Sequence, residues 1–593
     1  MYDDLDAAER PLDKRRKHSH IGYYLVDKGI NELIDKLEIR KNKSSNKKNV
    51  LKEESKIKVY CFAILIVSLA ISIFSSFYFL NKTNSIIISL LEFLIIFIPV
   101  TEIVIQIFQY VLNKIVKTKE IPKLDLSDGV PAELATMVVI PTIVNSIEKV
   151  KELMRKLEVF YLANKSENLY FCLLGDVTSS AKQNEEIDED IINQGLKECT
   201  RLNEKYSQNG NFPKFHFMYR NRVWSRGESC YLGWERKRGL LTQFNEYLLC
   251  NEENQFRVNT IENYKYDIAY GENIEKKEVK NKLPRIKYII TLDSDTNLSL
   301  NSGLELIGAM AHVLNKPVIK DGIVSEGYGI MQPRVGVGLL ESRKSLFTQI
   351  YASDGGVDLY ANAISDVYQD NFGEGIYTGK GIYDLSVFSE VLKDEIPENT
   401  VLSHDLLEGN YLRCGLASDI VLLDGYPYKY NAYISREHRW IRGDWQITRW
   451  LKKYIRDKDG NKKKNPLNFL DKFKIMDNLR RSLVDGFSVI NILLLILFSL
   501  IYKERFTGLI VITVIATLMP FLLTLINSIV FKRENIKKQK TFVKRITGLK
   551  ASLLRTIINF SVLPYQGYIA LNAICKTIYR VKITKKNLLE WCT

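Results

Sequence analysis

The strongest chemical signal in the sequence is a pair of carboxylates separated by one residue, in the run Asp293-Ser294-Asp295-Thr296. The pair directly follows the apolar run 288–292, which has the length and composition of a buried strand. Carboxylates fixed on a tight turn make a hard-oxygen site for Mg²⁺ or Mn²⁺, and such an ion commonly takes further ligands from water and substrate phosphates. A polar turn that holds no ion is the alternative interpretation.

Four short apolar runs predict the sheet that would position such carboxylates: 136–140, 169–174, 215–218 and 288–292. A helical pattern at 146–162 gives the alternation that is typical of an α/β domain. The second run ends in Gly175-Asp176, and ligands of open α/β sheets bind at the carboxyl ends of strands. We therefore expect Asp176 to lie near Asp293 and Asp295.

Three more motifs follow downstream: Ser403-His404-Asp405, Arg436-Glu437-His438-Arg439-Trp440 and Arg442-Gly443-Asp444-Trp445-Gln446. With them the sequence resembles the processive inverting glycosyltransferases, the cellulose- and chitin-synthase-like superfamily with a GT-A fold. That superfamily has a first Asp near the nucleotide, then an Asp-x-Asp, a Thr-Glu-Asp and a Gln-x-x-Arg-Trp. The matching residues are Asp176, Asp293, Asp295, Asp405, Arg439 and Trp440.

The match departs from the superfamily pattern at two positions. His404 replaces the Glu of the Thr-Glu-Asp motif, and Arg436 stands where the Gln of the last motif would be. A literal Gln-x-x-Arg-Trp occurs later, at Gln446, Arg449 and Trp450. We align the earlier copy, because the residues after it continue the superfamily pattern in register.

Longer runs carry a closer resemblance, to the transferase region of the cyclic β-1,2-glucan synthases. These runs are His20-Ile21-Gly22-Tyr23-Tyr24-Leu25, Gly233-Trp234-Glu235-Arg236-Lys237-Arg238-Gly239, Tyr377-Thr378-Gly379-Lys380-Gly381-Ile382-Tyr383-Asp384, residues 403–409 and Leu588-Leu589-Glu590-Trp591. Those synthases are much longer, with a phosphorylase-like carbohydrate region after the transferase. The resemblance implies a piece of a longer protein or a split gene product. It also implies three partners: UDP-glucose, a glucan acceptor and that carbohydrate-processing region.

The resemblance implies an inverting transfer of glucose by one in-line displacement. Asp405 would be the general base for the acceptor hydroxyl. Asp293 and Asp295 would hold the metal that neutralises the departing diphosphate, and Asp176 would contact the uridine.

Basic and aromatic residues are assigned to the two substrates by the same resemblance. Lys237 and Arg238 are candidates for nucleotide or phosphate contacts, with a solvated basic turn as the alternative, and Arg436 and Arg439 are placed with the diphosphate. On the acceptor side we place Trp440, which would stack on the sugar, Lys380 and His404. His404 would either be a structural neighbour of Asp405 or tune its pKa.

Apolar blocks without charges predict membrane spans at 59–80, 487–502 and 508–530. A further block at 86–116 carries Glu92, Pro99 and Glu102, so we expect a kinked span or one that leaves the bilayer early. Lysines and arginines cluster before the first span, after the second and after 530, which places both termini and the middle segment in the cytoplasm. We therefore expect a multi-pass protein of the inner or plasma membrane.

The predicted fold is an α/β GT-A (nucleotide-diphospho-sugar transferase) domain inserted between α-helical transmembrane segments. The predicted segments are 1–55, a basic cytoplasmic part; 56–116, two transmembrane helices; 117–465, the GT-A domain; 466–486, an amphipathic interfacial helix; 487–530, two transmembrane helices; and 531–593, a cytoplasmic or interfacial part. A packed soluble helix is the alternative at 466–486. In the last part, 551–574 would be a broken fifth span or an interfacial helix.

Composition agrees with a membrane protein that has a polar domain, since 46% hydrophobic residues coexist with 26% charged ones among 593. The eight cysteines are scattered without metal-ligand spacing, which indicates reduced thiols. The net charge of +15 is better explained by the membrane than by nucleic acid, for which the chain has no recognition motif. Three alternatives stay open: a β-1,4 or β-1,3 synthase, a transferase to a lipid-linked acceptor, and a catalytically inactive membrane scaffold.

Overall fold

The computed structural model describes residues 17–26, 29, 33, 53–206, 212–249, 255–262, 283–352, 367–530 and 548–590. An eight-stranded mixed sheet lies at its centre, in the order β12-β10-β11-β7-β1-β2-β3-β6. The strands are β1 (Thr136–Ile143), β2 (Leu169–Asp176), β3 (Phe215–Arg220), β6 (Phe256–Asn259), β7 (Tyr288–Thr291), β10 (Ile330–Val337), β11 (Gly381–Asp384) and β12 (Cys414–Asp424). The α/β architecture that the sequence predicts is confirmed, and the sheet is mixed.

The four strands predicted from apolar runs form the parallel centre of this sheet. β1 pairs in parallel with β7 on one side and with β2 on the other, and β2 pairs in parallel with β3. β11 is antiparallel to both β7 and β10, while β10 and β12 are parallel. β7 and β12 therefore run in the same direction, and their carboxyl ends lie at the same edge of the sheet.

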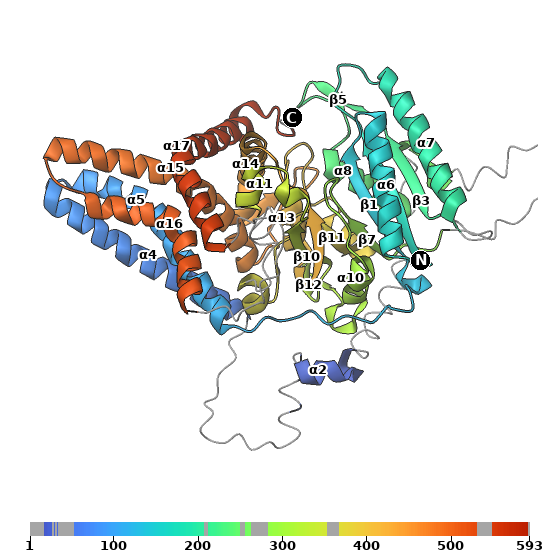
Figure 1. Ribbon diagram of the computed structural model, residues 1–593, viewed down its shortest axis with the longest axis horizontal. Helices are drawn as coiled ribbons and strands as arrows, with labels where there is room; N and C mark the ends of the chain where they lie inside the picture. The colour runs from blue at the N-terminus through green and yellow to red at the C-terminus, as the bar shows by residue number, and fades with distance from the viewer. Residues whose placement is uncertain are drawn as a thin grey trace, which may run out of the picture.

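Helices cover both faces of the sheet (Figure 1). α6 (Ile147–Ala163), α7 (Glu186–Tyr206) and α10 (Ser302–Ala311) pack on one face, and α8 (Arg236–Leu248), α12 (Leu385–Leu392) and α13 (Asp405–Tyr411) on the other. Residues along β1 alternate between the two layers, since Val138 packs with the first set and Val139 with the second. Burial on both faces explains why these strands are continuously apolar in the sequence.

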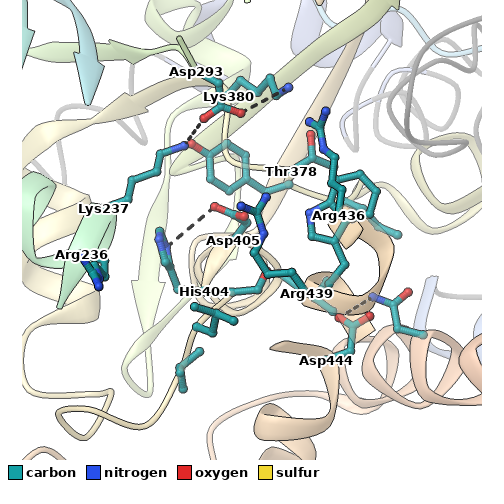
Figure 2. Close-up of a pocket in the computed structure, with 18 of the residues that line it drawn as sticks. Arg236, Lys237, Asp293, Thr378, Lys380, His404, Asp405, Arg436, Arg439 and Asp444 are labelled. Atoms are coloured by element: carbon teal, nitrogen blue, oxygen red, sulfur yellow. Dashed lines mark hydrogen bonds and ion pairs between the residues drawn. The ribbon is translucent and has the colours of Figure 1, made fainter. Parts of the chain in front are cut away.

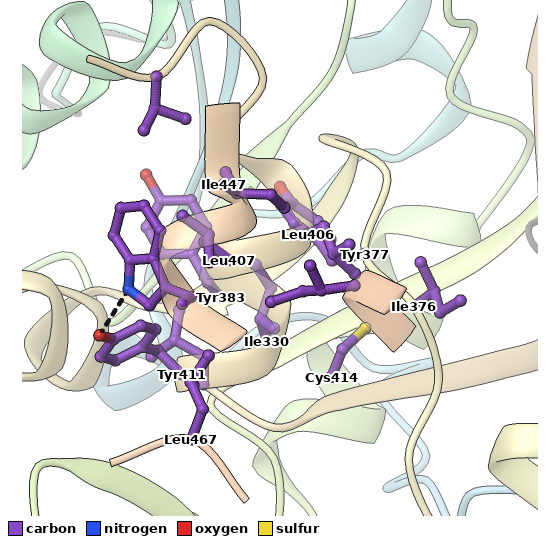
Figure 3. Close-up of a cluster of buried hydrophobic side chains, with 14 of the residues drawn as sticks. Ile330, Ile376, Tyr377, Tyr383, Leu406, Leu407, Tyr411, Cys414, Ile447 and Leu467 are labelled. Atoms are coloured by element: carbon purple, nitrogen blue, oxygen red, sulfur yellow. Dashed lines mark hydrogen bonds between the residues drawn. The ribbon is translucent and has the colours of Figure 1, made fainter. Parts of the chain in front are cut away.

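Figure 3 shows part of the hydrophobic core on the α13 side of the sheet. Leu407 and Tyr411 of α13 pack there with Ile447, and the indole nitrogen of Trp450 donates a hydrogen bond to the Tyr411 hydroxyl at 3.1 Å. Trp450 is fully buried. The literal Gln-x-x-Arg-Trp copy therefore contributes its tryptophan to the hydrophobic core.

Among the described residues, four helices are long and apolar enough to cross a membrane, which indicates a membrane protein. They are α4 (Glu53–Thr83), α5 (Ile86–Ile115), α15 (Phe469–Tyr502) and α16 (Thr507–Val530), and they extend together away from the sheet (Figure 1). α5 runs continuously through Pro99. α15 joins the segment predicted as amphipathic and the next span in one helix, which starts at a capping box between Asn468 and Asp471.

The apolar stretch predicted at 551–574 lies within α17 (Gly548–Tyr579). This helix packs against α15, α16 and α14 (Tyr430–Gln446). Because α14 also lines the cavity described below, α17 connects the membrane helices to the α/β domain.

Candidate active site

A cavity of about 240 Å³ lies between α8, α13, α14 and the ends of β7 and β12. It gathers most of the residues that the sequence singles out (Figure 2). Those in its wall are Lys237, Asp293, Lys380, His404, Asp405, Arg436, Arg439 and Trp440. Asp176, Arg238 and Asp295 are outside the set of described residues that line it.

Asp293 lies between two lysines, which reach it from either side (Figure 2). Lys237 Nζ is 2.6 Å from Oδ1, and Lys380 Nζ is 3.3 Å from Oδ2. Burial alone raises the pKa of Asp293, but the two ammonium charges outweigh it and hold that pKa well below its usual range. Burial lowers the pKa of each lysine, but nearby carboxylates outweigh it, so both pKa values are raised. Asp293 acts on both lysines, with Asp405 beside it for Lys237 and Asp424 for Lys380. Asp293 is therefore a fixed negative charge.

Asp405 begins α13, and its carboxylate faces the cavity. Oδ1 is buried and has no hydrogen-bond partner among the described residues, whereas the side chain as a whole is 28% exposed. Burial raises the pKa of Asp405 above its ordinary value, although His404 and Lys237 oppose the shift. A half-buried carboxylate with a raised pKa is suited to general-base catalysis, because it holds a proton more readily once transferred.

His404 lies beside Asp405 but pairs with Glu408. Its Nδ1 is 2.7 Å from Oε1 of Glu408 and 3.8 Å from Oδ1 of Asp405. Burial lowers the pKa of His404, and the two carboxylates more than reverse this, so the pKa is raised. The ligand atoms of these three residues lie within 4.8 Å of one another, as in a metal site. The hydrogen bond between His404 and Glu408 already occupies two of them.

α14 presents three of the predicted residues on one face, since Arg436, Arg439 and Trp440 are spaced three and four apart. The Arg436 guanidinium lies 5.0 Å from the Trp440 ring centre, and its Nη1 is 3.9 Å from Oδ2 of Asp295. Burial lowers the pKa of Arg439, and the neighbouring Arg436 adds to the shift. Two guanidinium groups of α14 thus line the cavity.

Asp176 is not among the described residues that line the cavity. It is buried at the end of β2, where Oδ1 accepts a hydrogen bond from Arg220 Nε at 2.6 Å. A Cβ on Gly233 would lie 2.0 Å from the same oxygen, so this glycine leaves room for the ion pair. Its uridine contact stays a prediction, as does the phosphate contact of Arg238, whose guanidinium pairs with Glu235.

Several residues that line the cavity have no role assigned to them from the sequence. Glu235 and Arg236 have φ of 51° and 53°, a conformation that costs energy and is found at functional sites. Asp424 and Leu589 also line the cavity. The segment around Leu589 is held by hydrogen bonds from Gln446 Nε2 to the Leu588 carbonyl and from the Leu589 amide to Glu228, each at 2.8 Å. Glu235 and Arg236 lie in the run 233–239, and Leu589 in the run 588–591, both of which carry the closer resemblance, whereas no motif includes Asp424.

The carboxylates fit a divalent ion unequally. Asp295 is 41% exposed, and its charged neighbour Arg436 stands 3.9 Å away, so its oxygens can bind an ion directly. Asp293 has a lysine on each oxygen, so it would ligate an ion only after exchanging one of them. Asp295 is therefore the better candidate ligand of the pair.

Comparisons with known proteins bear on the resemblance stated from the motifs. No family model matches the chain. Over 509 residues, or 85% of its length, the chain is 32% identical to the cyclic beta-(1,2)-glucan synthase NdvB of Rhizobium meliloti (strain 1021). The chain is related to the cyclic β-1,2-glucan synthases. It spans 17% of the length of this glucan synthase, so the resemblance is to one region of a much longer protein.

Proposed function

We propose that this chain is a membrane-bound inverting glycosyltransferase that transfers glucose from UDP-glucose to a growing β-1,2-glucan. The observation that carries the proposal is the position of Asp405, a carboxylate with a raised pKa, in a cavity whose wall also holds six lysine and arginine side chains. They are Arg236, Lys237, Lys380, Arg436, Arg439 and Arg481. A base for a hydroxyl and a binding site for a diphosphate are the two parts that such a transfer needs.

In the proposed reaction, Asp405 takes the proton of the acceptor hydroxyl while that oxygen attacks the anomeric carbon of glucose. The bond from this carbon to the diphosphate breaks, and UDP leaves with the electron pair. Because Oδ1 is buried, Oδ2 is the oxygen that an acceptor hydroxyl can reach. Arg436 and Arg439 stabilise the charge that develops on the diphosphate.

We further propose a GT-A fold for the α/β domain and a need for Mg²⁺ or Mn²⁺. Asp295, assisted by Asp293, would hold this ion, which supplies positive charge for the leaving diphosphate. Trp440 would stack on the acceptor sugar, next to Arg436. The domain would face the cytoplasm, where nucleotide sugars are available.

The β-1,2 linkage is supported by the name of the related glucan synthase. The three alternatives are outcomes of the same test: a β-1,4 or β-1,3 product, a lipid-linked product, or no turnover by an inactive scaffold. The length of the related synthase supports a further protein region as a partner. We propose that it is the phosphorylase-like carbohydrate region that the resemblance implies.

The test uses the full chain, reconstituted in nanodiscs with radiolabelled UDP-glucose and Mg²⁺ or Mn²⁺. We expect release of UDP and a product whose methylation analysis shows 1,2-linked glucose, with neither formed by the Asp405→Asn variant. Asp419→Asn is the matched control, because Asp419 pairs with Lys123 at the surface, 2.7 Å away. If UDP-glucose and other sugar nucleotides all stay intact, the scaffold interpretation replaces ours.

A further inference from the structure

Asp424 ends β12 as a buried carboxylate in the cavity wall, and no motif points to it. Its side chain is 1% exposed. Oδ2 forms an ion pair with Lys380, and Oδ1 accepts a hydrogen bond from the Thr296 hydroxyl at 2.5 Å. A carboxylate buried to this degree is stable only because both oxygens have partners.

Both partners of Asp424, Lys380 and Thr296, also contact Asp293. Thr296 closes the turn of the Asp-x-Asp motif, and its amide donates to the Asp293 carbonyl at 3.0 Å. Lys380 precedes β11, which is paired with β7 directly behind that turn. Its ammonium group bridges Asp424 and Asp293 Oδ2. Asp424 thus reaches Asp293 through the turn and through the lysine.

Main-chain contacts fix the same turn to the end of β12. The amide of Asn297 donates to the Leu423 carbonyl at 2.6 Å, and the amide of Gly425 donates to the Asp295 carbonyl at 3.1 Å. From α6, Lys156 Nζ donates to the carbonyl of Ser294 at 2.8 Å. These contacts hold the backbone of the turn on two sides, and the hydrogen bond from the Thr296 hydroxyl to Asp424 adds a third. Asp424 therefore acts on the turn through Thr296 and on the Asp293 side chain through Lys380.

We propose that Asp424 is a positioning residue for this site: through Lys380 and Thr296 it holds the Asp293 carboxylate in one orientation toward the cavity. The inference rests on the proposed transfer reaction and adds a residue to it. It also changes the role of Lys380, which acts on Asp293 instead of on the acceptor. Without Asp424, Lys380 keeps one carboxylate partner and can follow Asp293 into other orientations.

A double-mutant cycle in the full chain tests this route. Asp424→Asn is expected to lower kcat about 10- to 100-fold with little change in the KM for UDP-glucose, as for a misplaced catalytic group. In the Lys380→Met background the same change should add less than about a 3-fold loss, because the route through Lys380 is already broken. Asp419→Asn, on the same strand, should keep the unmutated kcat. Losses that multiply in the double variant, or an unchanged kcat in Asp424→Asn, would overturn the proposal.

Hydrogen exchange separates this inference from the proposed function. The amides of 291–297 should exchange faster in Asp424→Asn than in the unmutated chain and in Asp419→Asn. If no variant or unmutated chain releases UDP but this exchange rises, the function is wrong and the positioning role stands. If the chain is active but exchange in 291–297 is unchanged, Asp424 does not hold the turn. If Lys380→Met does not fold, the proposal is still tested by comparing kcat and hydrogen exchange of Asp424→Asn with those of Asp419→Asn.

Discussion

The carboxylate of Asp405 lies directly against the Cα atom of Gly379: a Cβ at Gly379 would stand 2.6 Å from Oδ1. Gly379 also has φ of +87°, in the region that favours glycine. Gly379 therefore leaves room for the carboxylate of Asp405, the proposed base. The residue after it, Lys380, contacts Asp293.

Gly379→Ala should therefore lower kcat by about 100-fold or more, because the methyl group displaces Asp405, while UDP binding persists. Turnover and UDP affinity would be measured on the same preparation. Gly322→Ala is the matched control, since Gly322 has φ of +80° but nothing within 4 Å of its would-be Cβ. If Gly322→Ala lowers kcat as much as Gly379→Ala does, backbone strain at a positive φ explains the loss, and contact with Asp405 does not.

Replacing Asp405 should remove turnover without removing the nucleotide site. Asp405→Asn is expected to lower kcat by about 10²- to 10⁴-fold, the usual contribution of a general base, with UDP affinity close to that of the unmutated chain. A collapse of UDP affinity as severe as the loss of rate would make Asp405 a binding residue.

The pH profile gives a separate prediction for the same residue. Only the ionised carboxylate accepts a proton, so kcat should rise with pH through the pKa of Asp405. Because burial raises this pKa, the acidic limb should have its midpoint above the ordinary value of 3.8 for an aspartate. The profile would be measured from kcat at saturating UDP-glucose. An acidic limb at or below 3.8 would contradict the assignment.

The two carboxylates of the Asp-x-Asp motif should respond differently to metal. Asp295→Asn should abolish transfer at low Mn²⁺ while the chain stays folded and inserted, and high Mn²⁺ should restore part of it. Asp293→Asn leaves Lys237 and Lys380 without their shared partner, so its loss should persist at any Mn²⁺ concentration. Activity titrations against Mn²⁺ would show this. Near-normal turnover of Asp295→Asn at low Mn²⁺ would refute the metal assignment.

The two Arg-Trp copies predict opposite phenotypes. Trp450 is fully buried, so Trp450→Ala should destabilise the α/β domain by about 3–5 kcal/mol. Trp440 lines the cavity, so Trp440→Ala should lower activity while the thermal unfolding midpoint stays nearly unchanged. Scanning fluorimetry and UDP release on both variants would distinguish them. Stable but inactive Trp450→Ala would mean that we aligned the wrong copy.

Local sequence patterns predict the helices and strands, but they do not predict which distant segments contact each other. The apolar runs predicted β1, β2, β3 and β7, and they placed Asp293 at a strand end, because these features depend on neighbouring residues. The strand-end pattern places Asp176 at the end of β2 but does not predict its ion pair with Arg220 of the next strand. No sequence motif includes Asp424, for the same reason. Its partners Thr296 and Lys380 lie far away along the chain and meet it only through the pairing of the sheet.

The orientation in the membrane can be tested at the short connectors between spans. Lys82 at the end of α4 pairs with Glu504 at 2.7 Å, so the α4–α5 and α15–α16 connectors lie on the same side, away from the α/β domain. The basic clusters predict that this domain faces the cytoplasm, where the proposed donor UDP-glucose would be available.

Cysteines introduced at Asn84, in the α4–α5 connector, and at Glu152, on α6, would report this with a membrane-impermeant thiol reagent. Both positions are exposed. In intact cells, Asn84→Cys should label above the level of the unmutated chain, whereas Glu152→Cys should label only after the membrane is opened. If Glu152→Cys is labelled in intact cells, the cavity lies outside the cytoplasm, where UDP-glucose is not available. A lipid-linked sugar would then have to be the donor.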